Sequence, residues 1–246
     1  MLKQAFWLAK KEIKYHRLSL LFTLLVTIFF ALITSVLLDE SVQKTFGPDI
    51  MHYNFFLLDV IFFIFTVSLS ANFMSGPYLS FRAIKEDPFS KRMAMLRTLP
   101  IPVPVLSLSR ILMMLMTLLV LSSVFYGTLA IALPEQFFQH IGPVEFVVFI
   151  LFWFGCALIL GGLNPFIEYG TSGKVLHLTP YIYFVIMAVI FTAFYQLFDI
   201  GLVEMILLGV KSNGWTLALF SLLPGIVACF LWNKILTIRL LKRDYD

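Results

Sequence analysis

Hydrophobic residues occur along this chain in long runs that few charged residues interrupt. Each run is long enough for a helix to cross about 30 Å of hydrocarbon at about 1.5 Å per residue. Inside a bilayer the backbone has to satisfy its own hydrogen bonds, and the alternation that marks barrel strands is not visible, so each run predicts a helix. We predict six transmembrane helices, at residues 18–38, 55–79, 105–133, 144–163, 179–198 and 215–235.

Two segments outside these runs predict shorter helices. In residues 1–17 an apolar face lies beside a face that carries Lys3, Lys10 and Lys14, which is typical of a helix in the membrane interface. The alternative is an ordinary basic flank of the first span, needed only for orientation. Residues 199–214 are apolar but too short to cross, and they predict a re-entrant or interfacial helix on the outer side.

The composition supports a membrane protein. Hydrophobic residues make up 60% of the chain and charged residues 13%, against about 45–50% and about 25% in soluble domains. The mean hydropathy of +0.94 is more than a soluble core requires. We therefore expect one all-α, polytopic membrane domain over residues 1–246, with an interfacial helix at 1–17, the spans within 18–235 and a cytoplasmic tail at 236–246.

Lys and Arg are concentrated in alternate connections. They lie before the first span, in residues 80–110, in residues 164–178 and after the last span, whereas the opposite connections carry only Lys44 and Lys211. Because positive residues remain on the cytoplasmic side, we expect both termini in the cytoplasm and a multi-pass protein of the cell membrane. The net charge of +4 then reflects topology, and no nucleic-acid partner is expected.

The sequence lacks motifs for nucleotide binding, metal binding and hydrolysis. The string closest to a phosphate-binding loop, at residues 170–175, has the wrong spacing and no hydroxyl after its lysine. No His-Glu-x-x-His motif occurs, and the four histidines form no cluster. Cys156 and Cys229 both lie in predicted spans, so no structural disulfide is expected. We expect this chain to hold no catalytic residue, metal or cofactor of its own.

The connection between the second and third spans carries the most informative pattern. Asp87 followed by Pro88 is a favourable helix start, and the three prolines of residues 100–104 end the helix. We predict a short cytoplasmic helix at 86–98 that exposes apolar side chains beside basic ones, as a docking element for another protein would. The exposed side chains are predicted to be Phe89, Arg92, Met93, Leu96 and Arg97. The alternative is a solvated basic loop.

This layout resembles the permease subunit of an ABC-2 type ABC transporter. The string Leu-Arg-Thr-Leu-Pro-Ile at residues 96–101, followed by Ser109 and Arg110, is similar to the motif after that family's coupling helix. The resemblance implies that residues 86–98 dock into a groove on an ATPase and that the loop at 164–170 makes a second contact. The implied coupling residues are Glu86, Asp87, Phe89, Arg92, Met93, Leu96, Arg97, Glu168 and Tyr169.

The resemblance also implies a division of labour between subunits. ATP and Mg²⁺ would bind a separate cytoplasmic ATPase, and two permease chains, identical or related, would form the pathway. The small size and the 27 phenylalanines are similar to the permeases of the staphylococcal phenol-soluble-modulin exporter, and the expected cargo is an amphipathic or hydrophobic peptide or a lipid-like molecule.

The proline-rich connection and the lack of a large extracellular domain depart from many family members. The alternatives are a transporter driven by an ion gradient and a non-transporting scaffold or sensor.

Polar side chains within the spans form a second candidate site. Asp59, Thr66 and Ser70 share one face of the second predicted span. A carboxyl inside a membrane is costly and is treated by default as functional, which suggests a substrate path or a subunit interface. The alternative is that Asp59 reaches the outer water. Gln196 and Glu204 lie near the outer end, where we expect them to line an exit.

Overall fold

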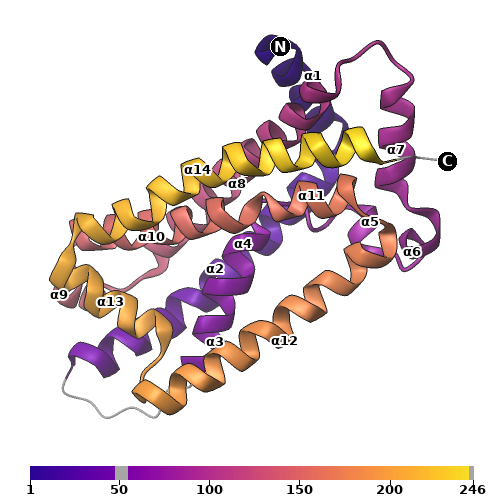
Figure 1. Cartoon of the computed structure of the whole chain (residues 1–246). Helices are drawn as coiled ribbons and strands as arrows, with labels where there is room; N and C mark the ends of the chain where they lie inside the picture. The colour runs from indigo at the N-terminus through magenta and orange to yellow at the C-terminus, as the bar shows by residue number, and fades with distance from the viewer. Residues whose placement is uncertain (48–54, 244–246) are drawn as a thin grey trace.

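The computed structural model describes residues 1–47 and 55–243. The described chain is helical and contains no strand (Figure 1). The helices in chain order are α1 (Leu2–Tyr15), α2 (Arg17–Phe46), α3 (Phe55–Val60), the π-helix η1 (Ile61–Phe65), α4 (Thr66–Ser68), α5 (Gly76–Leu79), α6 (Ala83–Glu86), α7 (Pro88–Arg97), α8 (Val103–Ala132), α9 (Glu135–His140), α10 (Pro143–Gly161), α11 (Leu163–Gly170), α12 (Gly173–Phe198), α13 (Leu202–Asn213) and α14 (Trp215–Lys242).

Five helices in the described residues are long and apolar enough to cross a membrane. They are α2, α8, α10 with its continuation α11, α12 and α14. Each lies where the hydropathy pattern predicts a span, although α2, α12 and α14 extend well beyond the predicted boundaries. The chain therefore has the architecture of a multi-pass, all-α membrane protein.

The predicted second span differs from a single helix. The chain is helical over Phe55–Ser68, which is shorter than the other apolar helices, and it then turns before α5 begins. Pro77 lacks a backbone N–H, and the polar side chains before it find partners elsewhere: Asn72 Nδ2 donates to Ser19 Oγ of α2 at 2.6 Å. The predicted span at 55–79 is therefore not one continuous helix, because these groups interrupt it.

The predicted loop at 164–170 is helical instead. Residues Leu163–Gly170 form α11, which continues the direction of α10 (Figure 1). Pro165 is tolerated because it lies in the first turn, where a missing N–H breaks no intrahelical bond. The segment at 199–214 contains the helix α13, which packs against α10 and α3; its re-entrant character stays a prediction.

Both chain ends lie at the same end of the helix bundle. The start of α1, the end of α14 and the short helices α6 and α7 gather there, whereas α9 and α13 lie at the opposite end (Figure 1). We call the first the basic end, because α1, α6, α7 and the end of α14 carry most of the Lys and Arg. We call the second the outer end. Which membrane side each faces stays a prediction.

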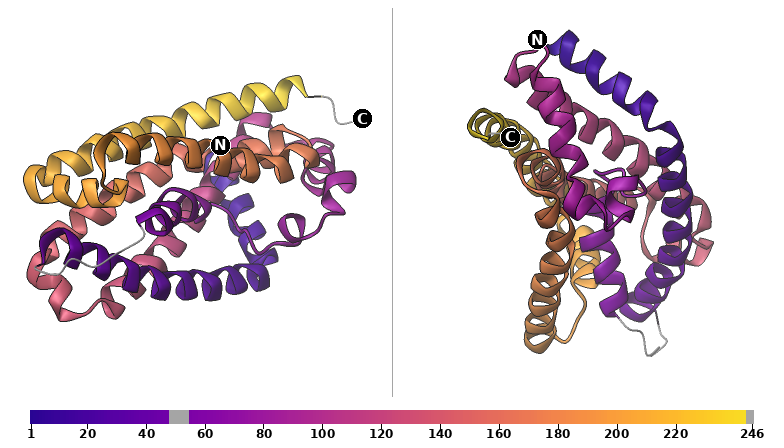
Figure 2. Two further views of the ribbon diagram at one scale, coloured as in Figure 1. Left: turned by 90° about the horizontal axis from the view of Figure 1, so that it is seen from below. Right: turned by 90° about the vertical axis from the view of Figure 1, so that its right-hand side faces the viewer.

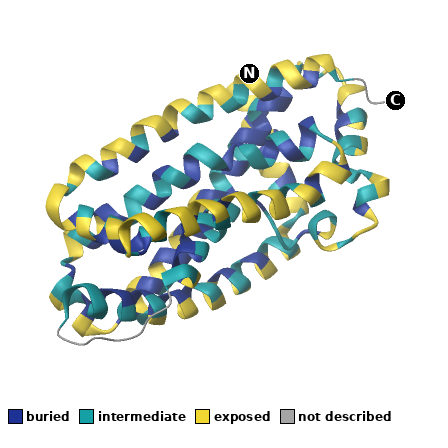
Figure 3. Ribbon diagram, turned by 60° about the horizontal axis from the view of Figure 1, so that its bottom comes forward, coloured by how far each residue is buried: buried dark blue, intermediate teal, exposed yellow. Residues whose placement is uncertain are grey.

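The helices differ strongly in how far they are buried (Figure 3). Helix α8 contacts α1, α2, α10, α11 and α14. In its most apolar stretch 61% of the residues are buried, against 11% in the corresponding stretch of α12. Two further views show α12 running along the outside of the bundle (Figure 2). Exposed apolar surface on α12 and α14 is expected for helices that face lipid or another membrane subunit.

Aromatic side chains fill the middle of the bundle. Phe62, Phe125, Phe149 and Trp153 have no exposed surface. The Phe62 ring centroid lies 4.8 Å from that of Trp153 and 5.2 Å from that of Phe149. Buried aromatic pairs of this kind hold η1 against α10, so this part of the predicted second span is fixed in the core.

Candidate functional site

A buried ion pair ties α1 to α8 at the basic end. Glu12 and Arg110 are 4% and 2% exposed. Arg110 Nη2 donates to Glu12 Oε1 at 2.6 Å, and Arg110 Nη1 donates to the other carboxylate oxygen. Nη1 also donates to the Tyr169 hydroxyl at 3.0 Å, and the guanidinium lies 4.5 Å from the Tyr169 ring centroid. This two-pronged pairing fixes the angle of α1 against the bundle and connects both helices to α11.

Helix α7 joins the same cluster through Arg92. Arg92 Nη2 lies 3.4 Å from Glu12 Oε1, and Arg92 Nη1 lies 2.8 Å from His16 Nε2. Since an arginine only donates, His16 Nε2 accepts and the imidazole is neutral. Burial, followed by the charge of Arg92, lowers the pKa of His16 below its ordinary value. His16 also joins α1 to α2, so the cluster links five helices: α1, α2, α7, α8 and α11.

Two apolar side chains of α7 point into the protein. Met93 has no exposed surface and Leu96 is 7% exposed, and both pack in a cluster with Tyr169, Leu236 and Leu240. The prediction that Met93 and Leu96 are exposed for docking is therefore wrong. Sequence alone could not show that α11 and α14 offer a matching apolar surface.

The remaining predicted coupling residues vary in exposure. Phe89 is half-buried between the rings of Tyr78 and Tyr169, whereas Glu86 and Arg97 are exposed. The helix start is confirmed: Asp87 caps α7 by accepting from the Ser90 N–H at 3.3 Å. Their coupling role stays a prediction.

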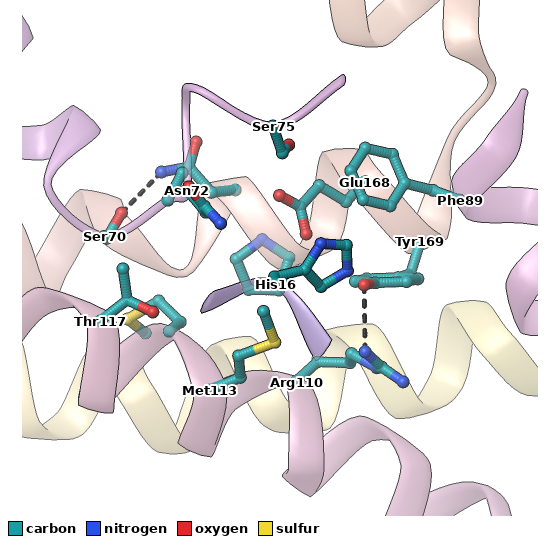
Figure 4. Close-up of a pocket in the computed structure, with 14 residues that line it drawn as sticks. His16, Ser70, Asn72, Ser75, Phe89, Arg110, Met113, Thr117, Glu168 and Tyr169 are labelled. Atoms are coloured by element: carbon teal, nitrogen blue, oxygen red, sulfur yellow. Dashed lines mark hydrogen bonds between the residues drawn. The ribbon is translucent and has the colours of Figure 1, made fainter. Parts of the chain in front are cut away.

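A cavity lined by both polar and apolar side chains lies beside the ion pair, between α8, α11 and the turn that follows α4 (Figure 4). It encloses about 490 Å³ of space, part of it open to solvent. Glu168 lies at its edge and accepts a hydrogen bond from the Tyr78 hydroxyl at 2.5 Å. Asn164 Nδ2 donates to Ser70 Oγ at 2.6 Å. The cavity walls are His16, Ser70, Ala71, Asn72, Ser75, Phe89, Arg110, Met113, Met114, Thr117, Asn164, Pro165, Glu168 and Tyr169.

Asp59 lies at the outer end and holds the start of α13. It has no exposed surface. Its carboxylate accepts from the backbone N–H groups of Leu202 and Val203, each at 2.8 Å, and from the Tyr195 hydroxyl at 2.7 Å. The free N–H groups at the start of a helix favour a negative charge, so Asp59 stabilises α13 and joins it to α3 and α12. Neither the substrate-path role nor contact with outer water is needed to explain this burial.

Of the other predicted path residues, Glu204 lies beside Asp59 at the start of α13, whereas Thr66 and Ser70 lie away from it. Thr66 Oγ1 donates to the Phe62 carbonyl oxygen within its own helix, and Ser70 lines the cavity at the basic end. Glu204 accepts from the Gly201 N–H at 3.0 Å and pairs with Lys44 at 3.2 Å. Gln196 lines an open groove between α3 and α12. Asp59, Thr66 and Ser70 do not share one face of a continuous helix, because the predicted second span is interrupted after Ser68.

Glu12, His16, Tyr78 and Arg110 belong to the site although the sequence pattern did not predict them as site residues. Glu12 is the only acid among the lysines of α1, and Arg110 is the only charged residue in the predicted third span at 105–133, so the sequence did mark both residues as unusual. No protein-family model, curated protein or solved structure matches this chain. Its function therefore has to be inferred from its own residues.

Proposed function

We propose that this chain is the membrane subunit of an ATP-driven exporter of the ABC-2 type. A separate ATPase would bind ATP and Mg²⁺ and act on the basic end, and two permease chains, identical or related, would form the pathway. The cargo would be an amphipathic or hydrophobic peptide or a lipid-like molecule. The five long apolar helices, the lack of nucleotide-binding motifs in the sequence and the sequence pattern around α7 support this proposal.

The packing of α7 is the observation that carries the proposal. Its buried side contacts α11 and α14 through Met93 and Leu96, and Arg92 reaches Glu12, which Arg110 of α8 also holds. A force applied to α7 from outside the membrane would therefore reach three long helices together. A solvated loop would transmit no such force.

The exposed side of α7 is where an ATPase would bind under this proposal. Lys91 and Arg97 are exposed, and the large side chains of Met95 and Leu99 are 62% and 47% exposed. An apolar centre with a basic rim suits a groove that is apolar inside and acidic at its edge. This surface replaces the Phe89 and Leu96 face that the sequence pattern suggested.

Affinity purification from native membranes tests the proposal. The tagged chain should retain an ATPase, and Met95→Glu should reduce that retention several-fold because it places a charge in the centre of the contact. Lys211→Glu, at the outer end, is the matched control and should retain the ATPase fully. Purification with no ATPase at all, or equal retention by Met95→Glu, would contradict the proposal.

Reconstituted vesicles separate this function from its rivals. ATP supplied on the ATPase side should drive cargo movement in the absence of any ion gradient. Movement that depends on a proton or sodium gradient and ignores ATP would instead identify a secondary transporter. Normal ATPase retention without any cargo movement would favour a scaffold or sensor.

A further inference from the structure

A groove lies between α1 and the proline-rich turn that precedes α8. It encloses about 730 Å³, part of it open to solvent, and its walls are Lys3, Gln4, Trp7, Leu8, Pro100, Ile101, Pro102 and Val105. Leu8 and Val105 form a buried apolar floor, with 8% and 1% exposure, whereas the Trp7 side chain is 60% exposed. The groove therefore combines an apolar interior with a wide open side.

The groove lies at the start of a helix that is able to cross a membrane. Val105, at its floor, belongs to the first turn of α8, which is one of the five helices able to cross a membrane. Tryptophan is enriched at this level of a bilayer, where its ring meets both acyl chains and headgroups. The apolar floor would thus be level with the first carbons of lipid chains, and the open side would be level with the headgroups.

The charge at the rim has one sign. Lys3 lines the groove, and Lys11 Nζ lies 4.9 Å above the Trp7 ring. None of the groove's lining residues is acidic. The only acid of α1, Glu12, is buried and paired with Arg110, so it does not neutralise the lysines of the rim. These charges favour an occupant that carries a negative charge beside an apolar chain.

We propose that the groove binds one anionic phospholipid, with an acyl chain over Leu8, Ile101 and Val105 and the phosphate between Lys3 and Lys11. Lysine stems lie along apolar surface while their ammonium groups reach the phosphate plane. The lipid would join α1 to the 98–102 turn, two segments that lie on either side of the groove. The site is independent of the proposed transport activity.

Fluorescence quenching by brominated lipids tests the site directly, because bromine quenches tryptophan only at short range. The full-length protein is placed in phosphatidylcholine nanodiscs that contain a small fraction of either brominated phosphatidylglycerol or brominated phosphatidylcholine. The chain has four tryptophans, so the Trp7 signal is taken as the difference between the wild type and Trp7→Phe. Phosphatidylglycerol should quench Trp7 much more strongly than phosphatidylcholine does.

Lysine variants assign the preference to this groove. Each basic residue at an anionic surface contributes about fivefold, so Lys3→Ala and Lys11→Ala should each lower the phosphatidylglycerol preference by about that factor. The matched control is Lys10→Ala with Lys14→Ala, which removes two charges from the helix face that also carries Lys3 but changes no residue that lines the groove. All these side chains are exposed, and elution as a single species verifies that each variant is folded.

Three outcomes would overturn the proposal. Equal quenching by the two lipids in the wild type would show no anionic site. An equal loss in the control variant would show only general attraction of α1 to a charged surface. Absence of quenching by either lipid would show that the groove excludes lipid and holds something else.

Discussion

Two buried carboxylates, one at each end of the bundle, are stabilised in different ways. Glu12 at the basic end is paired with Arg110 and lies near Arg92. Asp59 at the outer end has no cation among its hydrogen-bond partners, and accepts instead from two backbone N–H groups and the Tyr195 hydroxyl. The first arrangement depends on full charges that have to remain matched, whereas the second depends on the dipoles of a helix start.

This difference has consequences for movement. A charge pair shared between α1, α7 and α8 can be rearranged if a neighbouring cation takes over one partner, and Arg92 already lies beside Glu12. The backbone N–H groups that hold Asp59 belong to α13 itself and cannot exchange. Glu12 at the basic end therefore has two cations within reach, whereas Asp59 at the outer end is held by groups that are fixed in α13.

Removing Arg110 should have the largest effect. Arg110→Met leaves Glu12 buried beside only the half-exposed Arg92, and breaking such a buried pair costs about 3–5 kcal/mol. We expect thermal unfolding in detergent at a much lower temperature, with partial recovery in the double variant Arg110→Met and Glu12→Gln, which removes both charges. A single variant as stable as the wild type would show that the pair contributes nothing.

Truncating the buried side of α7 should come next. Leu96→Ala removes a side chain that packs in the basic-end cluster with Tyr169 and Leu236, and such changes cost about 2–4 kcal/mol. Met95→Ala, one residue away but 62% exposed, is the matched control and should change stability by less than about 0.5 kcal/mol. A larger loss of stability in Met95→Ala than in Leu96→Ala, measured by thermal unfolding, would mean that α7 packs its other face against the protein.

Asp59→Asn should have a smaller effect than either of these. The amide oxygen of asparagine can still accept one helix N–H, but the charge and a second acceptor are lost, which costs about 1–2 kcal/mol. We expect hydrogen exchange to increase in α13 while α1 is unaffected. Glu135→Gln, exposed at the same end, is the control. Normal stability together with lost transport would instead favour the substrate-path role.

Lowering the pH should have the smallest effect on stability of the four changes, and it should act through His16 at the basic end. The folded protein lowers the pKa of His16 from its ordinary value of 6.5, so the unfolded chain binds more protons as the pH falls below 6.5. Stability contributed by neutral His16 is present above that value and is lost as the pH decreases toward the folded pKa. His16→Gln should flatten the dependence of the unfolding temperature on pH in this range. An unchanged slope would show that other groups are responsible.

The long helices could be predicted from the sequence because their cause is local. A run of apolar residues has to form a helix in a bilayer whatever surrounds it, so α2, α8, α10, α12 and α14 follow from hydropathy alone. The start of α7 is local in the same way, since Asp87 and Pro88 act within one turn. The interruption of the helix after Ser68 is harder to predict from the sequence, because it depends on partners in other helices, such as Ser19 in α2.

Which side chains meet was decided by the tertiary structure. Glu12 and Arg110 are separated by most of the first half of the chain, and nothing in the local pattern pairs them. Met93 and Leu96 look like docking residues in sequence and are buried because α11 and α14 happen to cover them. Asp59 looks like a path residue and lies at a helix start that belongs to another segment. Local propensity determines where helices form, whereas the pairing of buried polar groups depends on the angles at which those helices cross.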